Sequence, residues 1–279
     1  MQVAITGAAG TVGSILRQEL AEMGLRCLLI DIKTISVQRA NERFAQVDIN
    51  DQPALTEALV GCDAVVHLAA CTTDAAWPDQ IKLSIEGTIS LFDAARANGI
   101  KRIIFTSSHH VVGFHPRGAG LSNKAILLPD SRYAVGKSFG ETIGALYACK
   151  YDMRVFCIRI GNLNNRPIDR RRLGNWISGR DFGQLVKIGL HHPDYIFEIV
   201  YGISDSTGRD YDNSRAYALG YNPQDRSEPW VDQVFEEDPP PELNSIAARS
   251  PAETTLGGQF SSIEFTGSPD RLRKFGVTD

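Results

Sequence analysis

The segment QVAITGAAGTVG, residues 2–13, decides the fold of this chain. It opens with an apolar run typical of a buried strand and continues through a G-x-x-G-x-x-G loop into a segment with helical periodicity. Glycines at such a turn permit a tight bend and let a pyrophosphate approach the backbone, where helix N-terminal amides meet its charge. We therefore expect a dinucleotide-binding turn formed by Gly7, Gly10, Thr11, Val12 and Gly13.

The same alternation of short apolar runs and longer helical segments continues to residue 160. We expect strands at residues 2–6, 27–30, 44–48, 64–68, 102–106 and 155–160, and helices at 12–23, 53–59, 81–98 and 132–151. The runs are apolar on both faces, which suits strands that helices cover on either side. The sequence therefore predicts an α/β fold with a Rossmann-type, doubly wound parallel sheet.

The regular alternation stops after Gly161. We expect a helix at 181–190, a strand at 196–201 and a short helix at 214–219 in the remainder of the chain. Residues 236–241 combine like charges with consecutive prolines, which favours an exposed, extended connector. We predict an NAD-binding Rossmann domain at 1–165 and a small C-terminal substrate-binding cap at 166–279.

Composition excludes several classes of protein. The chain has 279 residues, a formal net charge of −4 and a single short basic run at 170–172, so it lacks the basic surface that nucleic-acid binding requires. Its five cysteines are widely spaced without a C-x-x-C pair, which argues against a disulfide framework and a thiolate metal site. No secretory signal and no apolar run long enough to cross a membrane is visible, so we expect a cytoplasmic protein.

Asp31, at the end of the second predicted strand, points to the choice of cofactor. A carboxylate there accepts hydrogen bonds from the adenosine ribose hydroxyls and repels a 2′-phosphate, which favours NAD over NADP, although Lys33 nearby weakens the preference. We expect Asp48 and Ile49 beside the adenine, with a helix or turn cap as the alternative for Asp48. After the fourth strand, we expect small residues beneath the nicotinamide-side ribose: Leu68, Ala69 and Ala70. His67, just before them, is expected to form hydrogen bonds within the fold.

A second group of residues predicts chemistry at the carboxyl edge of the sheet. Tyr133 and Lys137 are four residues apart in a predicted helix and hence lie on one face. A nearby ammonium and a positive nicotinamide ring both favour the phenolate form of the tyrosine, which then acts as a base. Ser108 follows the fifth predicted strand, where open α/β sheets bind ligands, and its hydroxyl can hold the substrate oxygen.

Together with the glycine loop, these residues resemble the extended short-chain dehydrogenases/reductases over residues 1–165. That resemblance implies a catalytic trio of Ser108, Tyr133 and Lys137. Over nearly the full length, the chain resembles the NAD-dependent uronate dehydrogenases, which oxidise the anomeric carbon of galacturonate or glucuronate to a lactone. This closer resemblance rests on residues 107–113, 159–162, 175–178, 212–214 and 257–260.

The resemblance to uronate dehydrogenases also implies a substrate site. Arg171 stands where the family clamps the sugar carboxylate, and a planar guanidinium suits a carboxylate. A solvated loop is the alternative for Arg171, and ordinary cap packing is the alternative for Phe260, which would close the pocket. The other implied substrate residues are Thr72, Ser108, His109, His110 and Asn162. Three of these depart from the family pattern, since His109 replaces Asn and both Asn162 and Thr72 replace Ser; Ser84 also replaces an active-site Asn of extended members.

Other interpretations remain open at this stage. Metal binding by His109, His110 and His115, or by His191, His192 and Asp194, is disfavoured because neither set has helical i, i+4 spacing or a thiolate. We expect His191 and His192 to end a helix. Rival functions are an NAD-dependent sugar epimerase or dehydratase, a dehydrogenase of another sugar such as a sulfo-sugar, and a cofactor-binding regulator without turnover. We expect a homo-oligomer, since dimers that form through paired helices are common in the superfamily.

Overall fold

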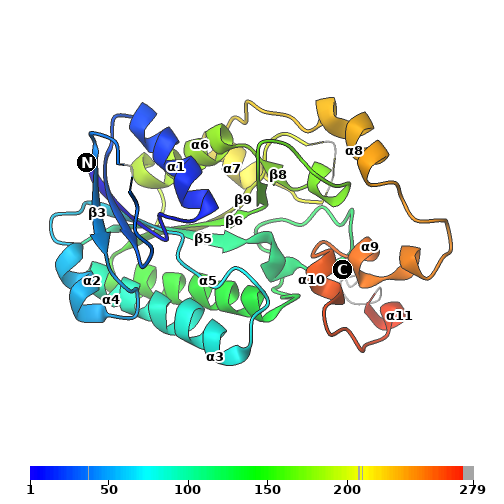
Figure 1. Cartoon of the computed structure of the whole chain (residues 1–279), viewed down its shortest axis with the longest axis horizontal. Coiled ribbons are helices and arrows are strands. Elements are labelled where there is room, and N and C mark those ends of the chain that lie inside the picture. Colours follow the sequence, from blue (N-terminus) through cyan, green and yellow to red (C-terminus); the bar gives the residue numbers. More distant parts are fainter. Residues whose placement is uncertain (37, 207, 209, 273–279) are drawn as a thin grey trace.

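A computed structural model describes residues 1–36, 38–206, 208 and 210–272. Its centre is a parallel sheet of seven strands in the order β3-β2-β1-β4-β5-β6-β9 (Figure 1). The strands are β1 (Gln2–Thr6), β2 (Arg26–Asp31), β3 (Glu42–Gln46), β4 (Ala64–His67), β5 (Arg102–Ser108), β6 (Arg154–Ile160) and β9 (Phe197–Gly202). The order reverses between β1 and β4, which confirms the predicted doubly wound Rossmann-type sheet and places a ligand crevice at its carboxyl edge.

Helices cover both faces of this sheet (Figure 1). On one face, α1 (Thr11–Glu22) and α6 (Gly179–His191) bury Leu16, Leu20 and Phe182 in one apolar cluster with the sheet. On the other face, α2 (Gln52–Ala58), α4 (Gly87–Ala97) and α5 (Arg132–Tyr151) contribute Leu55, Phe92 and Ile143, respectively, to a second cluster. Strand residues alternate between the two clusters, as expected for a sheet covered on both sides.

Two predicted elements of the first 160 residues differ from the structure in position or type. The third strand lies two residues earlier than expected, because buried Glu42 at its start is neutralised by Arg17 and Arg39. The helix predicted at 81–98 divides into α3 (Trp77–Gln80), a π-helix η1 (Ile81–Glu86) and α4. A π-helical turn often marks a functional site, and periodicity does not reveal one. The helix α5, by contrast, has the predicted bounds and begins at the Ser131 cap.

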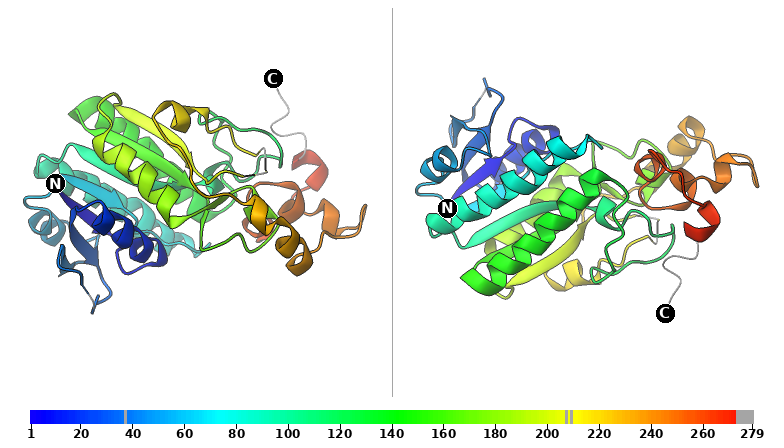
Figure 2. Two further views of the ribbon diagram at one scale, coloured as in Figure 1. Left: turned by 90° about the horizontal axis from the view of Figure 1, so that it is seen from above. Right: turned by 90° about the horizontal axis from the view of Figure 1, so that it is seen from below.

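Short elements, η2 from the middle of the chain and the others from the part after residue 161, lie beyond or beside the carboxyl end of the strands (Figure 2). They are η2 (His109–Val112), β7 (Asn162–Leu163), η3 (Arg171–Leu173), β8 (Trp176–Ile177), α7 (Ser214–Ala218), η4 (Glu228–Trp230), α8 (Val231–Glu237), η5 (Ala247–Arg249), α9 (Pro251–Thr254), α10 (Gln259–Ser262) and α11 (Pro269–Leu272). The predicted connector at 236–241 is wrong in part, because Glu236 and Glu237 close α8 and only the following residues are extended. The pairing of β7 with β8 was not predicted.

The main sheet does not stop at the expected domain boundary. Strand β9 pairs in parallel with β6, and α6 packs on the face of the sheet, although both lie after residue 165. The main sheet therefore includes residues on both sides of position 165, and the proposed domain boundary there stays a prediction. Among the described residues, no helix is both long and apolar enough to span a membrane.

Candidate active site

The glycine turn has the geometry that a pyrophosphate requires. Gly7 has φ +71°, and a Cβ there would lie 2.7 Å from the backbone nitrogen of Ala69, so the two strand ends meet only with glycine at this position. Gly10 is the N-cap of α1, and both Gly10 and Thr11 are exposed while Val12 is half-buried. The first amides of α1 therefore open at the carboxyl edge of the sheet, which fits the predicted dinucleotide site.

Asp31 lies against this turn. Its Oδ2 accepts a hydrogen bond of 2.9 Å from the amide of Ala9, and its Oδ1 accepts one of 2.9 Å from the amide of Lys33. The carboxylate is thus fixed at the end of β2, where an adenosine ribose would lie. Asp48 is exposed and accepts two hydrogen bonds from Asn50, as the turn-cap interpretation predicts. Its contact with adenine stays a prediction, as does that of Ile49, which is 7% exposed.

The end of β4 and the residues after it lie at the edge of the sheet where the cofactor is expected. His67 is fully buried, with Nδ1 2.7 Å from the Thr6 hydroxyl and Nε2 3.4 Å from the Thr88 hydroxyl. Burial first, and then the Lys137 charge, lowers the pKa of His67 to about 3, so the ring is neutral at pH 7. Its predicted structural role is confirmed. Residues 68–70 are half-buried at the edge that His67 supports.

The structure brings Ser108, Tyr133 and Lys137 together. Ser108 ends β5, whereas the other two residues lie on the first turns of α5, which packs beside that strand. Nζ of Lys137 donates a hydrogen bond of 2.7 Å to the carbonyl oxygen of Thr106 and lies 5.9 Å from the centre of the Tyr133 ring. All three side chains are buried, and they form a compact polar group at the carboxyl edge.

Burial controls the acidity of this group. It raises the pKa of the Tyr133 phenol to about 12; the interaction with the Ser108 side chain lowers that pKa and the Asp130 charge raises it. Burial also lowers the pKa of Lys137 to about 8. Without cofactor, burial of the Tyr133 phenol therefore has a larger effect on its pKa than the Lys137 ammonium, which was expected to favour the phenolate.

His110 and Phe260 enclose the tyrosine. Nδ1 of His110 lies 2.6 Å from Oδ2 of Asp130, so a proton on Nδ1 leaves Nε2 to face other partners. The ring of Phe260 stacks on Tyr133 with centroids 6.1 Å apart and meets His110 edge to face at 4.6 Å. Phe260 therefore packs on both rings, and its role in closing a substrate pocket stays a prediction. Asp130, which sequence reasoning missed, precedes the cap of α5 and carries no periodic signal.

Buried His109 and half-buried Arg171 form a second group, which adjoins the first through Ser108 and His109. Nη1 of Arg171 lies 3.4 Å from Nε2 of His109 and donates to the carbonyl oxygen of Leu256 at 3.4 Å. Among the described residues, no carboxylate lies within ion-pair distance of Arg171, while burial lowers the pKa of its guanidinium. The solvated-loop alternative for Arg171 is wrong, because the side chain packs inward against Gly258.

Unpaired amide oxygens lie near this group. Oδ1 of Asn162 and Oδ1 of Asn175 are both buried without a hydrogen-bond partner in the described structure. Nδ2 of Asn175 lies 3.4 Å from Nε2 of His109, and the backbone amide of Asn162 donates to the carbonyl oxygen of Asn175. Buried acceptors without partners are rare and suit the hydroxyl groups of a sugar. Sequence reasoning singled out Asn162 and missed the role of Asn175.

Thr72 and Ser84 differ in their surroundings. Thr72 is exposed in the loop after β4, and Asp74 of that loop binds Arg132 at the start of α5. Ser84 lies in η1, where its hydroxyl donates to Gln80. A Cβ on Gly136 would lie 2.6 Å from the Cβ of Ser84, so this serine packs directly on the helix that carries Tyr133. Its hydroxyl is committed to the fold.

The described residues contain no group of three or more side chains suited to a metal. His191 ends α6 and His192 is its C-cap, as predicted. All five cysteines are free.

Comparison with known proteins identifies the family. Residues 3–176 match the model of the NAD dependent epimerase/dehydratase family. The uronate dehydrogenase of Pseudomonas putida is 34% identical over 92% of this chain and 94% of its own length, and that of Agrobacterium fabrum is 32% identical over 88% and 92%.

Solved structures agree with these sequence relatives. A variant of uronate dehydrogenase from Agrobacterium tumefaciens, solved in complex with NAD, has a TM-score of 0.87 and 31% identity over 93% of this chain and 96% of its own. Glucuronic acid dehydrogenase from Chromohalobacter salexigens has a TM-score of 0.88 and 33% identity over 96% and 98%. The chain therefore belongs to the NAD dependent epimerase/dehydratase family and, within it, to the family of the uronate dehydrogenases.

Proposed function

We propose that the chain oxidises the anomeric carbon of a hexuronate, galacturonate or glucuronate, or of a related anionic aldose, to the lactone. The observation that carries this proposal is the half-buried guanidinium of Arg171, which has no carboxylate partner among the described residues and contacts His109, the residue that follows Ser108. Withdrawing a cation from water without a counter-ion costs free energy, so an anionic ligand is the natural complement.

The cofactor is NAD, in agreement with the family description. The glycine turn and the exposed amides of α1 fit its pyrophosphate, and Asp31 fits its adenosine ribose. When bound, NAD supplies the acceptor for the hydride that leaves the anomeric carbon. The chain's own residues hold the sugar and move the proton.

The proposed roles follow from the geometry of the buried group. Ser108 hydrogen-bonds the anomeric oxygen, and Tyr133 accepts the proton of the anomeric hydroxyl. Lys137 lies behind the tyrosine ring, where its positive charge favours the phenolate that accepts the sugar proton. Arg171 binds the sugar carboxylate, while Asn162 and His110 bind ring hydroxyls. Phe260 covers the reacting atoms and excludes water.

Absorbance in the NADH band tests this proposal. The purified chain is incubated with NAD or NADP and with galacturonate, glucuronate, neutral aldoses or sulfo-sugars. We expect net NADH with NAD and at least one hexuronate. An epimerase or dehydratase recycles its cofactor and gives no net NADH, so absence of NADH across the whole panel would reject the dehydrogenase assignment.

A cofactor-binding regulator without turnover is the rival from another class. The buried Ser108, Tyr133 and Lys137 group favours the enzyme, since a regulator has no need for a tyrosine and a lysine with perturbed pKa values at one site. Binding of NADH by the chain without any sugar oxidation would favour the regulator.

The proposal extends to location and assembly. A cytoplasmic location is supported by the five free cysteines, which suit a reducing compartment. A dimer through paired helices is supported by exposed apolar residues on two neighbouring helices, Ile89 of α4 and Leu146 of α5. Light scattering of the purified chain measures the assembly, and a Leu146→Glu variant should shift a dimer toward the monomer.

A further inference from the structure

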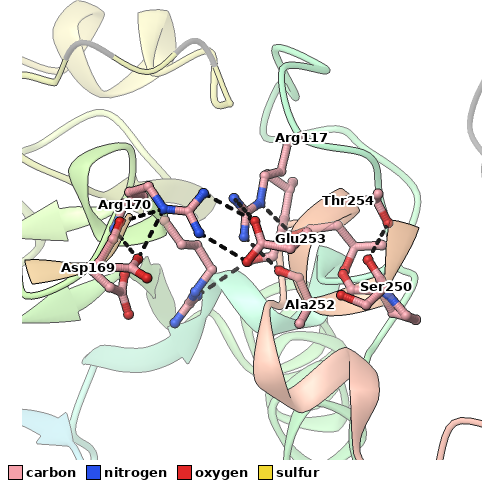
Figure 3. Close-up of polar contacts among 12 residues, drawn as sticks. Arg117, Asp169, Arg170, Ser250, Ala252, Glu253 and Thr254 are labelled. Atoms are coloured by element: carbon pink, nitrogen blue, oxygen red, sulfur yellow. Dashed lines mark hydrogen bonds and ion pairs between the residues drawn. The ribbon is translucent and has the colours of Figure 1, made fainter. Parts of the chain in front are cut away.

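An ion-pair network joins three distant segments of the chain beside the proposed carboxylate site (Figure 3). Nη1 and Nη2 of Arg170 donate to the two carboxylate oxygens of Glu253, each at 3.2 Å. Nη1 of Arg117 lies 3.9 Å from the same carboxylate, and its Nη2 donates to the carbonyl oxygen of Ala252 at 2.6 Å. Glu253 therefore lies between two guanidinium groups that would otherwise repel each other.

The ion-pair network holds the start of residues 251–260, the segment that contacts Arg171 and packs on Tyr133. From α9 the chain runs to Leu256, whose amide donates to the carbonyl oxygen of His115 at 3.0 Å and whose own carbonyl oxygen accepts from Arg171. Gly258 follows with φ +61°, and a Cβ there would lie 2.6 Å from Cδ and Nε of Arg171. The segment then reaches Phe260, which covers Tyr133.

The loop at 170–172 and the segment at 251–260 meet at the Arg171 side chain. Arg170, its neighbour in sequence, anchors the loop to Glu253, while Leu256 and Gly258 contact the Arg171 side chain from the segment that Glu253 begins. The Glu253 carboxylate thereby joins the loop that carries Arg171 to the segment against which the Arg171 side chain rests. Asp238 also holds Arg170, but from the connector after α8 and not from residues 251–260.

We infer that Glu253 is a positioning residue: it holds residues 251–260 against the loop at 170–172 so that Arg171 presents its free edge to the sugar carboxylate. This inference rests on the proposed function. The carboxylate side chain is 25% exposed and that of Arg170 is 14% exposed. A partly buried, two-pronged pair orders a segment better than a fully exposed pair does.

The Glu253→Gln variant removes the charge and keeps the shape of the side chain. We expect the KM for galacturonate to rise by about three- to tenfold, whereas kcat and the KM for NAD stay within about twofold, because an ion pair of this exposure is worth a modest free energy and acts on sugar binding alone. An unchanged KM for galacturonate would overturn the inference, as would an equal rise in the KM for NAD.

A matched control lies in the same region. Arg166 forms a similar two-pronged pair with Glu237 at 3.0 and 3.1 Å, but this pair ties the loop to α8 and not to residues 251–260. The Glu237→Gln variant should leave the KM for galacturonate unchanged. An equal rise in both variants would mean that any lost ion pair loosens the cap, which contradicts a specific role for Glu253.

A double-mutant cycle tests whether Glu253 acts through Arg171. In an Arg171→Ala background, the Glu253→Gln change should add less than about twofold to the KM for galacturonate, since the side chain that it positions is gone. A fully additive effect would contradict this route. The Glu253→Asp variant retains the charge and should restore part of the lost affinity, whereas a KM equal to that of Glu253→Gln would count against the ion pair.

Hydrogen exchange separates this inference from the proposed function. In Glu253→Gln, the amides of Leu256 and Gly257, which donate to His115 and Gly113, should exchange faster than in the unmodified chain. This measurement needs no substrate, so it stands even if the chain oxidises no sugar. Unchanged exchange at these amides would overturn the inference while leaving the proposed function intact.

Discussion

Nη1 of Arg171 lies 3.4 Å from Nε2 of His109, so a cation and an imidazole share one partly buried contact. Burial first, and then the charges of His110 and Arg171, lowers the pKa of His109 well below its usual value. The ring is therefore neutral at pH 7 and can accept a hydrogen bond from the guanidinium instead of repelling it. The Tyr211 hydroxyl, 3.2 Å from Nδ1, fixes the ring from the other side.

Arg171→Ala should raise the KM for galacturonate by about 10- to 100-fold, because a hydrogen bond to a charged group contributes about 1.5–3 kcal/mol. The KM for a neutral aldose should change little. Steady-state kinetics with both sugars measures the difference, with Arg166→Ala as the control for loss of a cap arginine. Equal effects on charged and neutral sugars would remove the clamp assignment.

His109→Asn should raise the KM for galacturonate by about three- to tenfold, with kcat nearly unchanged, because the shorter side chain no longer reaches both Arg171 and Tyr211. Tyr211→Phe removes only the partner of Nδ1 and should have a smaller effect. Kinetics of the two variants side by side tests this order. A larger loss in Tyr211→Phe would mean that His109 does not act through Arg171.

Local patterns in the sequence predicted the cofactor turn, which lies within one strand-turn-helix unit. They also predicted the group of Ser108, Tyr133 and Lys137, because these residues lie at the end of a strand and at the start of a helix whose periodicity is visible. The surroundings of Arg171 could not be predicted in this way. Its contacts with His109 and Leu256 join residues 62 and 85 positions apart, and they depend on loops without periodicity. Only the resemblance to uronate dehydrogenases pointed to Arg171, and it carried no information about Glu253.

Asp31→Asn should raise the KM for NAD by about tenfold and reduce the preference for NAD over NADP. The amide keeps one acceptor for the backbone of Ala9 or Lys33 but loses the charge that repels a 2′-phosphate. Kinetics with both cofactors measures the preference. Asp51→Asn is the control, because Asp51 caps α2 without contact with the glycine turn. An unchanged preference for NAD over NADP would show that Asp31 does not bind the adenosine ribose.

Tyr133→Phe should reduce kcat by about 10²- to 10⁴-fold, which is the usual contribution of a general base, while NADH still binds. Tyr147→Phe is the matched control, since Tyr147 lies on the same helix and donates to Asp93 at 2.7 Å, away from the polar group. Kinetics and NADH fluorescence report turnover and binding separately. Retention of turnover in Tyr133→Phe would exclude the tyrosine as the base.

Lys137→Met should abolish turnover and yet stabilise the chain without cofactor at pH 7. Burial lowers the pKa of Lys137 from 10.5 to about 8, so holding the charge inside the folded chain costs on the order of 3 kcal/mol. The Lys137→Met change removes this cost and so stabilises the folded chain. It also removes the hydrogen bond to Thr106, which reduces the gain in stability by about 1 kcal/mol. The melting temperature should therefore rise by several degrees, roughly 2–4 °C per kcal/mol for a chain of this size.

The sign of the pH dependence distinguishes this explanation from simple repacking. Below pH 8 the folded and unfolded chains both hold the proton on Lys137, and the full cost of burial is present. Between pH 8 and 10.5 the folded chain has lost that proton while the unfolded chain retains it, so the stability of the unmodified chain approaches that of Lys137→Met. Thermal unfolding at pH 7 and at pH 10 should show the gap narrowing, whereas Lys101→Met, at an exposed lysine, should show no such change. A gap of constant size would mean that the lysine is not held as a buried charge, and that the ammonium behind Tyr133 owes its place to packing alone.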